Sequence, residues 1–435
     1  MKFKILLPAL IIDLLMIITC YPQEAAKDSL TLEDAIRMTL VNQPLILQAL
    51  EQVNAADARI KQQNSFYYPR VDGNLAYARI GPIPSIGFQG LTFDLAPADN
   101  YNANISASQL IYDFGKRDAL LDLAQTYKLT TEDQIKLIKN NLTYRTVNVF
   151  YAILFLRKGV EVKNEQINTL KQHIEVANKR FQTGSATDFD ILTTQVRVAD
   201  AENQKVDIEN ELSKAEINLR SLLNFPSDKK LNLSGVFKVD SLGYDSASLL
   251  DEAFRNRPEM KLARDAEKSS MVTKQVASLE DMPDLHVLGM AGIKNGYQPD
   301  LNEAIINWIV GVNASIPIFD GNLRDAKVEE ADANLKSSSE NISALERDIK
   351  VEVEHAAADV KANRFKINTV KLQVEQAVKA VSRAEIQYRD GVTTNLDLID
   401  ATTSLAQARL SYLQIQYKNI LSNYNLKRAI GVVLY

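Results

Sequence analysis

The hydrophobic pattern of the chain predicts two very long helices. The tracts Lys116–Gln182 and 322–390 contain no proline and a single glycine, Gly159. Because a helix rises about 1.5 Å per residue, each tract would extend about 100 Å. Each tract ends close to a second glycine, Gly184 or Gly391, which can supply the turn into a shorter return helix.

The second long tract carries a coiled-coil seam. The residues of this seam recur at alternating spacings of three and four, and all of them except Asn363 are apolar. The seam consists of Val353, Ala356, Val360, Asn363, Ile367, Val370, Val374, Ala377, Val381, Ala384 and Tyr388. Since an ordinary helix drifts away from such a register, the seam predicts a helix that wraps around a neighbour.

Four shorter segments alternate apolar and polar residues, which is the period of a β-strand. These segments are 71–77, 101–108, 285–293 and 306–316. The last has the clearest apolar stripe, formed by Ile306, Trp308, Val310, Val312, Ala314 and Ile316. The Gly- and Pro-rich links 80–100 and 295–303 are predicted to be loops at the tips of two hairpins.

The two halves of the chain repeat each other. Asp113 and Asp320, Gly184 and Gly391, and Leu219 and Leu426 are matched pairs whose members lie 207 positions apart. Each half also opens with a helical pattern, 32–64 or 248–279, that is interrupted near a proline. We therefore predict one structural repeat over 25–224, a connecting segment over 225–247 that forms a collar, and a second repeat over 248–435.

Residues 1–24 are predicted to be a signal peptide. Lys2 and Lys4 precede a mostly apolar stretch over 5–18. The only cysteine, Cys20, ends a segment that is similar to a lipoprotein cleavage box, so lipidation at Cys20 and ordinary cleavage nearby both stay open. The apolar stretches are too short for a comfortable helical span, so a membrane location would require strands.

Composition and charge favour neither nucleic-acid binding nor enzyme chemistry. The net charge is −5 and no basic run stands out, which argues against a nucleic-acid partner. His173, His286 and His355 are scattered without metal-ligand spacing. We expect His173 and His355 on the surface of helices, and His286 on a strand that faces a lumen. With no phosphate loop or nucleophile motif, we expect no cofactor, no metal and no catalytic residues.

Four amphipathic strands predict an assembly larger than one chain. They are too few to close a barrel and would leave open edges in lipid. Three chains would supply twelve strands for a transmembrane β-barrel and twelve long helical passes for a hollow cylinder. The fold prediction is therefore α+β, with a coiled-coil helical barrel and a β-barrel in a homotrimer. A pore-less periplasmic coiled-coil scaffold or adaptor explains the seam, but it gives the strands no purpose.

Over essentially its whole mature length, the chain resembles TolC-family outer-membrane efflux proteins. The resemblance rests on the duplicated halves, on the junctions at 112–115 and 319–321, and on the segment 388–409, in which Gly391 precedes Asn395, Asp397 and Asp400. It implies a trimer in outer-membrane lipid with a periplasmic helical tunnel. It also implies docking to a periplasmic adaptor and an inner-membrane pump, and passive export of small molecules or proteins through the tunnel.

Asp397 and Asp400 are candidates for a pore constriction. They lie three apart on one face of the helix that follows Gly391. From spacing alone, the preference of helix starts for acidic residues explains them too. The resemblance implies that these positions line the narrowest part of the tunnel entrance, where six carboxylates per trimer would attract cations and raise some carboxylate pKa values.

The resemblance also implies that Tyr388 and Asp190 hold neighbouring helices together at a closed entrance. The lock of the family uses an arginine shortly after the turn glycine, where this chain has Thr393, so Arg389 is a candidate replacement. Tyr388 is explained equally well as the last seam residue. Trp308, Tyr77 and Tyr101 are candidates for aromatic belts at the bilayer edges, although aromatic residues also suit ordinary strands.

Overall fold

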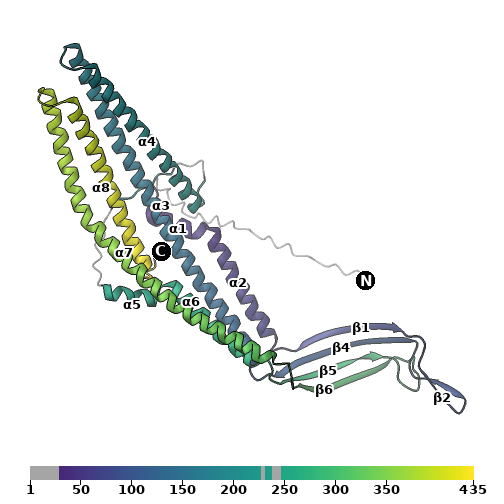
Figure 1. Cartoon of the computed structure of the whole chain (residues 1–435). Coiled ribbons are helices and arrows are strands. Elements are labelled where there is room, and N and C mark those ends of the chain that lie inside the picture. Colours follow the sequence, from purple (N-terminus) through teal and green to yellow (C-terminus); the bar gives the residue numbers. More distant parts are fainter. Residues whose placement is uncertain (1–28, 227–230, 238–245) are drawn as a thin grey trace, which may run out of the picture.

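The chain forms an elongated helical body with a β-sheet at one end (Figure 1). This computed structural model describes residues 29–226, 231–237 and 246–435. The predicted signal peptide, Cys20 and part of the predicted collar lie outside the described residues.

Apart from the short strands β2 and β3, both halves follow the same order of elements. The first half contains α1 (Leu32–Asn42), α2 (Pro44–Ser65), β1 (Arg70–Arg79), β2 (Ser85–Phe88), β3 (Leu91–Asp94), β4 (Asp99–Tyr112), α3 (Lys116–Gln182) and α4 (Asp188–Leu223). The second contains α5 (Ser246–Asn256), α6 (Pro258–Ser278), β5 (Asp284–Lys294), β6 (Ile305–Ser315), α7 (Leu323–Arg389) and α8 (Asn395–Ala429). Pro44 and Pro258 begin α2 and α6, because proline lacks the N–H that a helix interior needs but fits its first turn.

The four predicted strands form one antiparallel sheet in the order β1-β4-β5-β6. Their register aligns the predicted stripes: Gly73, Ile105, Ala291 and Trp308 form one row across the sheet, and Val71, Ala107, Gly289 and Val310 form the next. This face is apolar and exposed, whereas on the other face the Asn74 amide donates to Asn104 and Ser106. The predicted strand faces are therefore confirmed.

The prediction of a plain loop over 80–100 is wrong in part. β2 and β3 form a small antiparallel hairpin within it. Gln89 and Gly90, at its turn, both have positive φ, which matches the right-handed twist of paired strands. Since each strand has only four residues, the alternation was too short to be distinguished from a loop.

The hairpins α3–α4 and α7–α8 pack as a layer in the order α4, α3, α8, α7 (Figure 1). The predicted seam on α7 is buried or half-buried along its length, and its ends share cores with α8 residues such as Leu398 and Leu426. The seam therefore packs α7 against a neighbouring helix. Within the described part of the chain, no helix combines the length and apolar character needed to cross a membrane.

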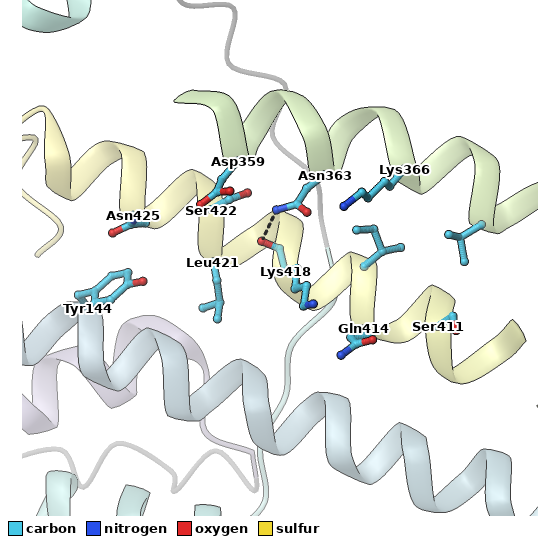
Figure 2. Close-up of a pocket in the computed structure, with 12 residues that line it drawn as sticks. Tyr144, Asp359, Asn363, Lys366, Ser411, Gln414, Lys418, Leu421, Ser422 and Asn425 are labelled. Atoms are coloured by element: carbon cyan, nitrogen blue, oxygen red, sulfur yellow. Dashed lines mark hydrogen bonds between the residues drawn. The ribbon is translucent and has the colours of Figure 1, made fainter. Parts of the chain in front are cut away.

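A polar groove lies beside the middle of the seam, between α7, α8 and α3 (Figure 2). The amide of Asn363 donates across it to the backbone carbonyl of Lys418 at 3.3 Å. Lys366, Gln414 and Ser422 also line the groove. A polar seam residue is tolerated here because its amide has a backbone partner and polar surroundings.

The described part of the connecting segment packs near the midpoint of α3. Leu30 donates to the carbonyl of Asn232 at 2.7 Å, and Ser234 donates back to the carbonyl of Leu30 at 2.9 Å. Leu231 joins a buried cluster that includes Phe150 and Leu219. The segment thus ties the N-terminal chain to the middle of the helical body.

Candidate channel entrance at the helix tips

The ends of the long helices form two turns at the tip remote from the sheet (Figure 1). α3 ends at Gln182 and α7 at Arg389, and the glycines that follow, Gly184 and Gly391, have φ values of 72° and 77°. Only glycine adopts this left-handed conformation at little cost, so both predicted turns are confirmed.

Both return helices begin with the same capping box. The Thr187 hydroxyl accepts from the backbone N–H of Asp190, and the Asp190 carboxylate accepts from the Thr187 N–H at 2.9 Å. Thr394 and Asp397 repeat this arrangement at the start of α8. Asp190 and Asp397 therefore hold equivalent positions in the two halves, and each carboxylate also lies at the positive end of a helix dipole.

One oxygen of the Asp397 carboxylate is engaged within its own turn. This oxygen accepts from the Thr394 hydroxyl at 2.6 Å, the Thr393 hydroxyl at 2.8 Å and the Thr394 N–H at 3.0 Å. These hydrogen bonds, with Thr394 contributing most, lower the pKa of Asp397. Within one chain the shift is thus opposite to the increase expected from crowded carboxylates. Thr393, where the resemblance implied an arginine, donates to Asp397 instead.

Asp400 lies one turn further along the exposed face of α8. Its carboxylate is 3.7 Å from the guanidinium of Arg197 on α4. Both side chains are largely exposed, so this ion pair is weak. The predicted pair of acids therefore does share one accessible face, as their spacing indicates.

Tyr388 is held by an arginine that sequence reasoning missed. The Arg180 guanidinium lies 4.8 Å from the centre of the Tyr388 ring, and its Nη1 donates to the Tyr388 backbone carbonyl at 2.6 Å. Tyr388 is only 6% exposed, and its hydroxyl has no hydrogen-bond partner among the described residues. Arg389, the candidate from the sequence, is exposed and pairs with the adjacent Asp390 at 3.8 Å.

Asp190 joins the two hairpins through its backbone. The buried Asn395 amide donates to the Asp190 carbonyl at 2.9 Å and to the Thr194 hydroxyl at 3.0 Å. In the sequence, only position indicated that Asn395 and Arg180 would join the two hairpins. Asn395 is the first residue of α8, and Arg180 lies one turn before Gly184.

His173 is buried, so the prediction of a surface location for it is wrong. It lies between Leu170 and Ala177 at alternating three- and four-residue spacing, on the buried stripe of α3. Burial lowers the pKa of His173. His355 is exposed, as predicted. No group of three metal-ligating side chains occurs within the described residues.

An exposed amphipathic sheet joined to long helical hairpins, which are bound together at their tips, defines an elongated channel-forming class of protein. A family model described as outer membrane efflux protein matches residues 35–224 and 249–432. The chain belongs to this family of outer-membrane efflux channels, so the resemblance found in the sequence is confirmed.

Three distant relatives are similar to the chain over most of their length. The chain is 22% identical to outer membrane protein TolC of Salmonella enteritidis over 420 residues, covering 91% of this chain and 83% of that protein. It is 22% identical to cobalt-zinc-cadmium resistance protein CzcC of Cupriavidus metallidurans, covering 94% of this chain and 92% of that protein. The crystal structure of the Campylobacter jejuni CmeC outer membrane channel superimposes with a TM-score of 0.81 at 16% identity, covering 92% of this chain and 85% of that one. This last similarity shows the α+β fold.

Proposed function

We propose that this protein is the outer-membrane subunit of a tripartite export system. Three copies form a passive conduit whose helical tunnel crosses the periplasm and is opened by a periplasmic adaptor and an inner-membrane pump. The observation that carries this proposal is the sheet, because its apolar face has no cover within the described chain. Leu75 is 88% exposed and Trp308 is 73% exposed, a surface suited to lipid rather than water. A pore-less scaffold would not need such a face.

The free edges of the sheet support a homotrimer. β1 and β6 each pair with one strand only in the described chain. An open edge is unsatisfied in lipid, and twelve strands from three copies would close it. Tyr77, Tyr101 and Trp308 lie toward the end of the sheet remote from the helices, where we propose one aromatic belt.

The two outer helices of the layer also support a ring of copies. α4 has an exposed stripe at strict three-four spacing, opposite the stripe that it buries against α3. The exposed stripe consists of Phe189, Leu192, Val196, Ala199, Asn203, Val206, Asn210, Ser213 and Ile217. On the other edge, α7 exposes Val351, Ala358, Phe365, Leu372 and Ile386 at multiples of seven residues. Packing of α4 on α7 of the next copy would be head-to-tail and would close into a ring.

Charges on the α4 stripe are expected to prevent trimer formation. Val196 and Val206 are both exposed in the single chain, so Val196→Glu with Val206→Glu should leave the monomer folded but lower the trimer fraction at least severalfold. Chemical cross-linking of membrane-extracted protein measures this fraction. Asn218→Glu, which adds a charge beside the stripe, is the matched control. Normal trimers in the double variant would contradict the proposed α4–α7 interface.

The conduit itself is tested by single-channel current in planar lipid bilayers. We expect small, cation-preferring steps, because three copies of Asp397 and Asp400 would form two stacked carboxylate rings at the entrance. Asp397→Asn with Asp400→Asn should reduce the cation preference severalfold, whereas Asp207→Asn, an exposed acid midway along α4, should not. Unchanged selectivity in the double variant would refute the ring assignment. A wild-type protein that never enters bilayers would favour the scaffold.

A further inference from the structure

We propose that Arg180 is the latch of the channel entrance, the residue that holds the two helical hairpins of one chain together in the closed state. This inference rests on the proposed conduit. The hairpins α3–α4 and α7–α8 come from different halves of the sequence, and Arg180 and Tyr388 are separated by 208 positions. Their contact therefore exists only when the two tips are packed together.

Three interactions converge on the Arg180 guanidinium. It lies over the ring of Tyr388, which favours a cation electrostatically. It donates a charge-assisted hydrogen bond to the Tyr388 carbonyl, one of the last carbonyls of α7. The negative end of the α7 dipole attracts the same positive charge. Lysine could supply the charge but not the planar stacking surface.

Both partners are fixed to the turns that would have to separate. The backbone carbonyl of Arg180 accepts from the N–H of Ser185 at 2.7 Å and from the Thr183 hydroxyl at 2.9 Å, which anchors the α3–α4 turn. On the other side, a Cβ at Gly391 would lie 3.8 Å from Arg180 Nη2, so the guanidinium lies beside the α7–α8 turn as well. Moving either turn would break the latch.

The other contacts between the tips are suited to positioning instead. Arg197 and Asp400 are 3.7 Å apart and exposed, so water screens them. Asn395 makes neutral hydrogen bonds at the base of the turns. Arg180 alone combines a formal charge, a short hydrogen bond and a buried aromatic partner. It supplies an inter-hairpin arginine in a chain whose Thr393 donates to Asp397 at the start of α8.

The latch is tested with Arg180→Ala, Arg180→Lys and Arg389→Ala in the full-length protein. Arg389→Ala is the matched control, because it removes an exposed arginine from the same tip. In bilayers, Arg180→Ala should raise the mean open conductance severalfold, Arg180→Lys should give an intermediate value, and Arg389→Ala should match wild type. Trimer yield and thermal unfolding show that each variant is assembled.

Hydrogen–deuterium exchange provides a second measurement that does not depend on conduction. Amides of the two turns, 183–187 and 391–394, should exchange about tenfold faster in Arg180→Ala, while amides of the helical body keep their wild-type rates. Wild-type conductance and exchange in Arg180→Ala, or equal loosening by Arg389→Ala, would overturn the latch. Absence of current in both the wild type and Arg180→Ala would overturn the conduit, and the exchange rates would still decide whether Arg180 binds the tips together.

Discussion

Replacing Val310 and Val312 by aspartate is expected to prevent assembly in the outer membrane while the helices still form. Both side chains are exposed on β6, on the same face as Trp308. If that face meets lipid, the two substitutions place six carboxylates per trimer against hydrocarbon. Each charge near the bilayer centre costs on the order of 2 kcal/mol, so the trimer level should fall at least about tenfold. Membrane fractionation and circular dichroism measure the two expectations.

The opposite face of the same strand provides the control. Asn307 and Asn313 alternate with the valines and pair across the sheet with Gly292 and His286. The double variant Asn307→Asp with Asn313→Asp adds the same charge where we expect water, so it should assemble close to normally. Equal loss in both variants would mean that both faces are buried. Normal trimers in the valine variant would show that the lipid contacts a different surface.

Long elements could be predicted from the sequence almost residue by residue. The absence of proline predicted a helix with the same bounds as α3 in the structure. The tract predicted over 322–390 corresponds to α7, which is one residue shorter at each end. The faces of the sheet followed from alternation, because a shift of one residue would move every apolar side chain to the other face.

The contacts at the entrance could not be predicted in the same way. Arg180 binds a residue from the other half of the chain, and its partner is defined by how two coiled coils pack rather than by local spacing. Arg389, adjacent to Tyr388 in sequence, was the natural choice, but at the end of a helix it points to solvent and pairs with Asp390. His173 shows a related error. Its charged neighbours suggested the surface, whereas its spacing from Leu170 placed it on the buried stripe.

The second large effect is expected at the middle of the helical body. Arg257, between α5 and α6, is a buried arginine whose side chain is only 5% exposed. Its guanidinium contacts Glu352 on α7 at 2.5 Å and Glu259 at 3.1 Å. Arg428 of α8 reaches the other oxygen of Glu352 at 2.6 Å. Because Arg257→Ala would leave partly buried carboxylates with fewer partners, we expect the free energy of unfolding to fall by about 3–5 kcal/mol.

Denaturant unfolding monitored by circular dichroism measures this loss. Arg37→Ala is the control, since Arg37 is an exposed arginine with an ion pair to Asp34, and its removal should change stability by less than about 1 kcal/mol. Equal stability of Arg257→Ala and the control would show that the buried network contributes little to stability.

The dependence on pH separates loss of charge pairing from loss of packing. Burial alone would raise the pKa of Glu352, but Arg257 and Arg428 together bring it below its ordinary value of 4.5. A carboxyl with a lowered folded-state pKa stabilises the protein above that ordinary value, and the contribution disappears as the pH falls through the lowered pKa. The difference between wild type and Arg257→Ala should therefore be full at neutral pH and shrink in acid, where protonated Glu352 no longer needs its arginines. A difference that stays constant down to acid pH would assign the loss to packing around the guanidinium.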